Sequence, residues 1–313
     1  MLLCEYALTP DVLDAASYSS DEVAGIRLQQ LKEVLLAEGL VRNLRNGNWS
    51  RLFRDSGRAW HKRGKEFLRK LEQQARLRLV GPVLGDEPTT DHEWCHEALE
   101  SHNVESPLTG IISAAAVAER FRSEPLVEAI QRLSSTPWWT TRSSSVRLAR
   151  TLDQYKTQLR LMLKCANSVM FIDPHLDPTQ TRYGDFLSLL LEMAGRKPAP
   201  LLEVHRVCHF GGQDRRNQRD ETGWKVMFQS WSQPLLNAGL TAKVFIWDHF
   251  HDRYAISNLL GISVPNGFDT TTDLSGATTW TRLGRSERDD IQREFDPASK
   301  RHALRHCFKI PEA

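Results

Sequence analysis

Long apolar runs are missing from the 313-residue chain: none approaches the roughly 20 residues that a membrane-spanning helix requires. We therefore expect no integral membrane protein. The first five residues contain no basic stretch followed by an apolar segment, so a secretory signal is not expected either. Cysteine is scarce, because the chain has only five, widely spaced and without a Cys-x-x-Cys pair. This pattern predicts reduced thiols in a cytoplasmic protein.

Two common phosphate-binding signatures are also absent. The sequence contains neither Gly-x-x-x-x-Gly-Lys-Ser/Thr nor Gly-x-Gly-x-x-Gly. Nothing in it therefore favours a nucleotide-hydrolysing or dinucleotide-binding protein, and we expect no cofactor.

Charge is unevenly distributed, although the formal net charge is only +2. Residues 42–80 contain twelve Lys or Arg against three acids, whereas residues 86–105 contain seven acids and no Lys or Arg. Such a basic block is typical of nucleic-acid binding, and equally of an exposed helix with a solvated face. The phosphate contacts predicted for a nucleic-acid surface are Arg51, Arg54, Arg58, Lys62, Arg63, Lys65 and Arg69, with Arg215 and Arg216 in a glycine-opened loop.

The pattern of apolar residues changes near residue 140. In the first part, apolar residues recur at helical spacing, most clearly over 21–38, where Gly39 is a natural stop. Further helices are predicted over 58–78, 90–101, 114–121 and 125–133, with one short strand at 77–80. Residues 1–140 are therefore expected to form a mainly helical, basic region, followed by a loop rich in Ser and Thr.

Residues 141–313 instead alternate between strand and helix patterns. Strands are predicted at 168–174, 201–207 and 241–247, and helices at 146–166, 186–194 and 224–238. This alternation predicts an α/β domain with at least three strands covered by helices. In such sheets the chemistry lies at strand ends and in the loops beyond them.

The strand predicted over 241–247 leads directly into a polar segment with His251 and Arg253. Two residues apart on an extended chain, these side chains are expected to point to the same face. An imidazole attacks phosphorus or transfers a proton, and a guanidinium binds the non-bridging oxygens, so the pair suits a phosphodiester. Asn266 adds a hydrogen-bond donor. A plain Asp252–Arg253 salt bridge beside a structural His251 is the alternative interpretation.

This segment resembles the signature of the phospholipase D-like superfamily, His-x-Lys-x4-Asp followed by Gly-Ser-x-Asn. His251 stands at the position of the nucleophilic His and Arg253 at that of the phosphate-binding Lys, while Asn258 replaces the Asp and Asn266 the Ser. The segment 169–175 resembles the first core strand of that fold. The resemblance covers about residues 146–275.

The resemblance implies a phospholipase D-like sheet flanked by helices in 141–313, and a nuclease that works through a phosphohistidine without a metal. Active members bring two motifs together, so a single motif implies a homodimer. The His-Asp-Arg-Tyr variant resembles proteins of bacterial defence and mobile-element loci. This implies DNA or RNA as substrate, and a role in antiviral defence, alone or in a larger complex. Asn258 leaves open an alternative, a catalytically inactive nucleic-acid-binding sensor or subunit.

A competing motif lies in the acidic segment. His92, Glu93 and His96 match His-Glu-x-x-His, and His102 follows where metzincin-type proteases carry a third zinc ligand. Leu99 occupies the position that needs a turn glycine in those proteases. A zinc protease is therefore a remote alternative, and an acidic surface helix docked by Trp94 is the simpler interpretation.

Overall fold

The computed structural model describes residues 2–54, 58–209, 219–273 and 275–312. The chain divides into two compact units: an N-terminal unit, Leu3–Arg142, and a C-terminal unit, Ser143–Ala313 with Met1–Leu2. The boundary predicted near residue 140 lies close to this division. Within the described residues, no helix is long and apolar enough to cross a membrane.

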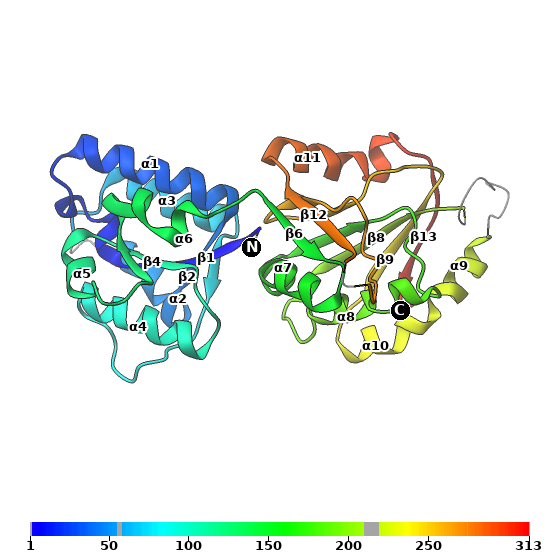
Figure 1. Cartoon of the computed structure of the whole chain (residues 1–313), viewed down its shortest axis with the longest axis horizontal. Coiled ribbons are helices and arrows are strands. Elements are labelled where there is room, and N and C mark those ends of the chain that lie inside the picture. The colour runs from blue at the N-terminus through cyan, green and yellow to red at the C-terminus, as the bar shows by residue number, and fades with distance from the viewer. Residues whose placement is uncertain (1, 55–57, 210–218, 274, 313) are drawn as a thin grey trace. The chain divides into compact units, whose positions relative to one another are not determined.

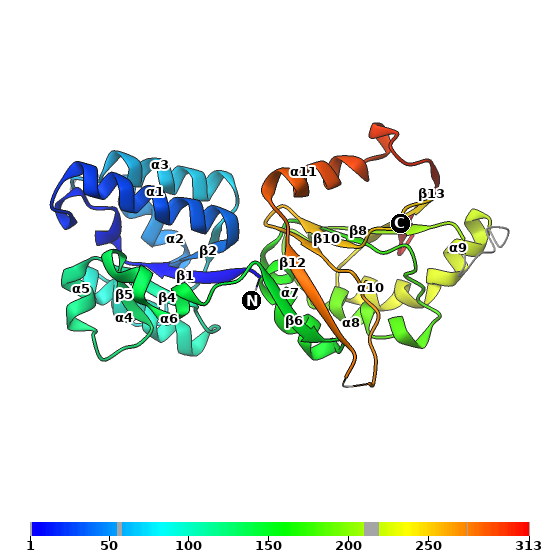
Figure 2. The same ribbon diagram turned by 45° about the horizontal axis from the view of Figure 1, so that its top comes forward.

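The N-terminal unit is built on a five-stranded parallel sheet in the order β3-β2-β1-β4-β5. Its strands are β1 (Cys4–Leu8), β2 (Gly39–Asn43), β3 (Leu77–Leu79), β4 (Gly110–Ser113) and β5 (Val127–Ala129). Its helices are α1 (Asp21–Glu38), α2 (Leu44–Arg51), α3 (Lys62–Gln73), α4 (Asp91–Val104), α5 (Ala115–Arg120) and α6 (Pro137–Thr140). Figure 2 shows α1 and α3 on one side of this sheet and α4 and α5 on the other.

The expectation of a mainly helical N-terminal region is therefore wrong. Strands β1, β2, β4 and β5 were not predicted, and segment 125–133, expected to be helical, holds β5 and a 3₁₀ turn. Parallel strands covered on both faces show no polar alternation, so strands of three to five residues leave little periodic signal.

A buried ion pair joins two strands of this sheet. Glu5 of β1 and Arg42 of β2 are both inaccessible to solvent, and Arg42 Nε lies 2.9 Å from Glu5 Oε1. Arg42 also donates to the carbonyl oxygens of Ser101, in the last turn of α4, and of Ser106, which follows that helix. Part of the basic block is thus structural and lies inside the fold.

The C-terminal unit contains an eight-stranded mixed sheet in the order β13-β9-β8-β7-β10-β11-β12-β6. Its strands are β6 (Ser145–Ala149), β7 (Ser168–Ile172), β8 (Leu201–Val207), β9 (Ala242–Trp247), β10 (Tyr254–Ser257), β11 (Gly261–Ser263), β12 (Ala277–Arg282) and β13 (Leu304–Ile310). Its helices are α7 (Leu152–Cys165), α8 (Phe186–Leu191), α9 (Glu221–Phe228), α10 (Ser232–Asn237) and α11 (Arg285–Glu294). Figure 1 shows these elements along the chain, and in Figure 2 α7, α8 and α10 lie on the side opposite α11.

The mixed α/β class predicted for this unit is confirmed, and the three predicted strands are β7, β8 and β9. Segment 146–166 is not a single helix, because Ser145–Ala149 forms β6 and pairs with β12, and α7 begins only at Leu152. Strand pairing across about 130 residues of sequence overrides the local helical pattern here.

Candidate functional site

Three parallel strands of the C-terminal unit end at one edge of the sheet, and histidines follow each of them. Strands β7, β8 and β9 pair in parallel, so their carboxyl ends share that edge. His175 follows β7, His209 follows β8, and His249 and His251 follow β9.

The segment that carries His251 crosses this edge. Strands β8 and β7 lie between β9 and β10, so residues 248–253 must pass the ends of both strands to reach β10. Strand β10 begins at Tyr254, which pairs with Ile172, the last residue of β7. The topology therefore brings the segment onto the strand ends that carry His175 and His209.

The imidazole rings lie near one another. The His249 and His251 ring centroids are 4.3 Å apart in an edge-to-face arrangement, and those of His209 and His249 are 6.2 Å apart. His251 is exposed to solvent. A ligand at the carboxyl ends of these strands can therefore reach the His251 imidazole, and the His249 ring lies beside it.

Arg253 is fixed in position by groups on three sides. Its Nε lies 3.6 Å from Asp173 Oδ1, and its Nη1 donates to the carbonyl oxygens of Pro265 at 3.2 Å and His251 at 3.5 Å. The side chain remains 26 % exposed. A guanidinium that is oriented but still accessible is suited to binding an anion.

Asp173 is the buried anchor of this arrangement. Its side chain is inaccessible and accepts hydrogen bonds from the backbone N–H groups of His175 and Phe268 and from the Tyr183 hydroxyl. Burial raises the pKa of Asp173, and the two N–H donors and Arg253 oppose that rise. The carboxyl group thus joins the segment after β7, the turn at 264–267 and Arg253.

Gly267 is required at its place in that turn. Its φ of +70° is unfavourable for other residues, and a Cβ there would lie 2.1 Å from Asp173 Oδ2. The absence of a side chain lets the turn carrying Asn266 approach the buried carboxyl group.

The electrostatics around His175 favour an anion. Burial lowers the pKa of His175, and the positive charges of Arg253, Arg182 and Arg206 lower it further. Arg206 is buried and donates to the carbonyl oxygens of Leu176 and His209. Arg206 therefore links the segment that carries His175 to the segment that carries His209, and it places a buried positive charge beside both.

Three of the four predicted catalytic residues gather at this edge. His251 and Arg253 lie just before β10. Asn266 is exposed and lies in the turn after β11, next to Pro265, whose carbonyl oxygen accepts a hydrogen bond from Arg253. Asn258, the fourth, lies apart from the other three. Asn258 follows the far end of β10, and its Oδ1 accepts from the backbone N–H groups of Asn167 and Ser168, before and at the start of β7.

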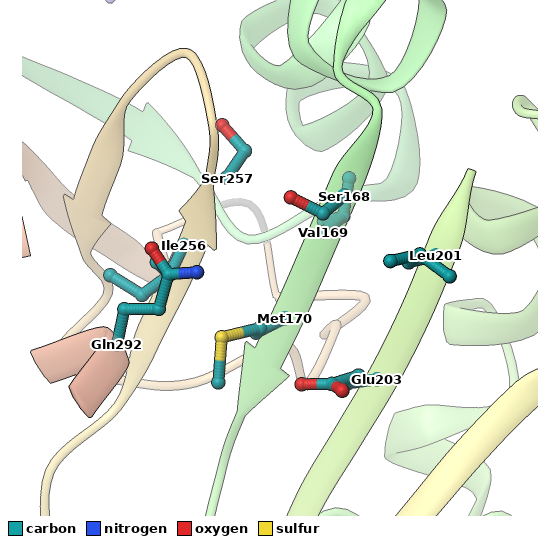
Figure 3. A pocket seen from close by; sticks show the side chains of 8 residues that line it. All are labelled: Ser168, Val169, Met170, Leu201, Glu203, Ile256, Ser257 and Gln292. Atoms are coloured by element: carbon teal, nitrogen blue, oxygen red, sulfur yellow. The ribbon is translucent and has the colours of Figure 1, made fainter. Parts of the chain in front are cut away.

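Figure 3 shows the far end of these strands, where Ser168, Ser257 and Gln292 line a hollow of about 160 Å³. Asn258 therefore ties β10 to the start of β7, away from the histidines. Its identity as Asn and not Asp removes no charge from the edge that carries His251.

The basic block is less available than its composition suggests. Arg58 forms a bidentate pair with Asp91, Arg54 pairs with Glu72, and Lys62 lies 3.5 Å from Asp21. Arg51 donates to the side-chain oxygen of Asn48, and Arg63 to the Gly25 carbonyl oxygen.

Lys65 and Arg69 differ from these residues. They are exposed on α3, with no ion-pair partner within 4 Å among the described residues. Arg215 and Arg216 lie outside the described residues.

The zinc-protease alternative is contradicted by the geometry. Helix α4 runs without a break through Leu99 to Val104. Glu93 closes a capping box with Thr90, and hydrogen bonds from Thr89 and Thr90 lower its pKa to about 2, so it is a poor base. His102 Nδ1 accepts from the Leu108 N–H, and no metal-binding cluster occurs among the described residues.

Sequence reasoning missed His175, His209, His249 and Asp173 as site residues. A signal was present, because each predicted strand of the parallel set is followed within four residues by a histidine. Only the strand order shows that these loops share an edge.

Comparisons with known proteins give little guidance. Neither a protein family nor a curated protein matches the chain. Among solved structures, TrmBL2, an archaeal chromatin protein, aligns with 10 % identity and a TM-score of 0.27, covering 79 % of this chain and 84 % of that chain. A TM-score this low does not establish a common fold.

Proposed function

We propose that the C-terminal unit is a phospholipase D-like phosphodiesterase that cleaves DNA or RNA. The observation that carries the proposal is the convergence of His251 and Arg253 with the imidazoles of His175, His209 and His249 at the carboxyl edge of β7, β8 and β9. Imidazoles supply a nucleophile and proton transfer, and the guanidinium supplies charge stabilisation, the components that phosphodiester cleavage needs.

The reaction proceeds in two steps, formation and hydrolysis of a phosphohistidine. In the first, a ring nitrogen of His251 forms a bond to phosphorus, and the bond to the leaving oxygen breaks and gives that oxygen its electron pair. A neighbouring imidazole protonates the leaving oxygen. In the second step, water attacks the phosphohistidine, its proton passes to an imidazole, and His251 departs as the leaving group.

Arg253 binds the non-bridging oxygens during both steps. Asp173, Pro265 and the His251 carbonyl hold the guanidinium before substrate arrives, so little reorganisation is needed. Asn266 donates a further hydrogen bond from the turn. The lowered pKa of His175 favours the unprotonated imidazole, which is the form that can accept the proton of the attacking water.

One chain already supplies several imidazoles to this edge, so the second proton-transfer group does not require a second motif. A homodimer, a larger complex and a role in antiviral defence stay predictions from the resemblance. One argument for the inactive nucleic-acid-binding alternative is weakened, because Asn258 lies at the other end of β10.

The proposal is tested by incubating the full chain with labelled single- and double-stranded DNA and RNA in EDTA. Cleavage should continue in EDTA and fall at least about a thousandfold in His251→Ala, as expected when a covalent nucleophile is removed. His96→Ala, an exposed histidine of α4 in the other unit, is the control and should retain full activity. Salt-dependent binding without cleavage would favour the inactive module, and no binding would refute both.

A further inference from the structure

A second site, unrelated to the phosphodiesterase proposal, lies in the N-terminal unit. From β1 the chain adds β2 and β3 on one side, and then returns to place β4 on the other side of β1. The strand order therefore reverses between β1 and β4. In open parallel sheets, ligands bind at the carboxyl ends of the two strands where this reversal occurs.

A cavity of about 580 Å³ occupies that position. It is lined by residues that follow β1, among them Asp11 and Ser17, by Ala114 and its neighbours after β4, by Asp91 and His92 at the start of α4, and by Arg58. This volume is in the range of small-molecule sites in proteins.

A carboxyl group with little solvent exposure lines the cavity. Asp11 is only 6 % exposed, and it accepts hydrogen bonds from the Thr9 hydroxyl and the Ala114 N–H. Burial, and then the charge of Asp91, raises the pKa of Asp11 to about 6. His92 also lines the cavity, and its buried Nε2 has no hydrogen-bond partner among the described residues.

The charges around the cavity select the sign of the ligand. Both Nη atoms of Arg58 donate to Asp91, and its Nε lies 3.8 Å from Asp14, so two carboxylates neutralise this guanidinium. Asp11 adds a further negative charge without a cation paired to it within 4 Å in the described chain. An anion would be repelled, whereas a cation would gain a largely desolvated counter-ion.

We infer that this cavity binds a small organic cation, a primary amine, whose ammonium group pairs with Asp11 and whose carbon skeleton lies along the alanines at 114–116. Alanine has no polar side-chain atom, so no side chain of Ala114, Ala115 or Ala116 brings a polar group to this wall. An ammonium donates up to three hydrogen bonds, which the Asp11 carboxylate and the Ser17 hydroxyl can accept.

The test is isothermal titration calorimetry of the full chain at pH 7.5 with putrescine, spermidine and glucosamine, beside ribose and inorganic phosphate. At least one amine should bind, and Asp11→Asn should weaken it about ten- to a hundredfold, the loss expected for one charge-assisted hydrogen bond. Asp86→Asn, which removes an exposed carboxylate of the same unit, should leave the affinity unchanged.

The pH dependence gives a second readout. Amine affinity should increase between about pH 5 and pH 7 in the wild type and much less in Asp11→Asn, because only ionised Asp11 attracts the cation. The other titratable or charged groups near Asp11 are Asp14, Tyr18, Arg58, Asp91, His92 and Cys95, and the variant retains all of them. Failure of every amine to bind, equal affinity in Asp11→Asn, or tighter binding of ribose or phosphate would overturn the inference.

Discussion

Replacement of Asp11 by Asn should make the N-terminal unit more stable at neutral pH. The pKa of Asp11 is raised from 3.8 to about 6, so the folded state binds the proton more tightly than the unfolded state. The contribution of Asp11 to the free energy of unfolding is therefore greatest below pH 4, falls as the pH rises from about 4 to 6, and stays lower above that range. A shift of about 2 pKa units corresponds to about 3 kcal/mol.

The side chain of Asn fits the same contacts. Its oxygen can accept from the Ala114 N–H, and its amide can donate to Thr9 Oγ1, which already lies 3.3 Å from the Ile112 carbonyl oxygen and can donate there. The substitution should therefore remove the cost of the buried charge without leaving an unpaired polar group.

The assay is urea denaturation of the full chain at several pH values between 3.5 and 7.5, with the wild type and Asp86→Asn as references. The difference in free energy of unfolding between Asp11→Asn and the wild type should grow by about 3 kcal/mol from the lowest to the highest pH. Other titrating groups cancel in this difference. A difference independent of pH, or one that decreases as the pH rises, would refute the reasoning.

Three further predictions concern residues that the structure places in defined roles. Glu5→Gln should lower the free energy of unfolding of the N-terminal unit, measured in urea, by roughly 3–5 kcal/mol, because it leaves the buried charge of Arg42 without its partner. Glu105→Gln, which removes an exposed partner of Arg78, should lower it by less than about 1 kcal/mol. Equal effects would contradict this account. Gly267→Ala should lower the melting temperature of the C-terminal unit and reduce cleavage, whereas Gly284→Ala, with negative φ and open space around it, should do neither; tolerance of Gly267→Ala would argue against the placement of Asp173. In a plot of log affinity for duplex DNA against log salt concentration, the double variant Lys65→Ala/Arg69→Ala should give a slope smaller in magnitude by about 2. The double variant Arg120→Ala/Arg122→Ala is the control and should keep the wild-type slope. An unchanged slope in the first variant would show that α3 does not contact phosphates.

Some helices and strands were predicted correctly from their own residues. The helix predicted at 21–38 coincides with α1, because Ser20 caps its first turn and Gly39 follows its last residue. The strand predicted at 201–207 coincides with β8. In both cases the information lies within the segment itself.

The N-terminal sheet could not be predicted in the same way. Strands β1 and β4 have five and four residues, buried throughout, and β1 pairs with strands that lie 35 and 104 residues further along the sequence. Arg42 and Arg78 read as members of a basic surface, but their charges are taken up by Glu5 inside the sheet. Composition alone does not show which charged residues are paired.

The candidate site was predicted in part for a related reason. His251 and Arg253 belong to one continuous motif, so the sequence is sufficient to select them. His175 and His209 become neighbours of that motif only because β8 and β7 separate β9 from β10 in the sheet. Asn258 belongs to the same continuous motif, yet the length of β10 carries it to the opposite edge.

The stereochemistry of cleavage at a chiral phosphorothioate linkage in isotopically labelled water, whose oxygen makes the phosphorothioate product chiral, tests the covalent role of His251 most directly. Each in-line displacement inverts the configuration at phosphorus, so attack by His251 followed by attack of water should give a product with retained configuration. A product with inverted configuration would show that water attacks the phosphodiester in a single step, and it would contradict the proposed phosphohistidine.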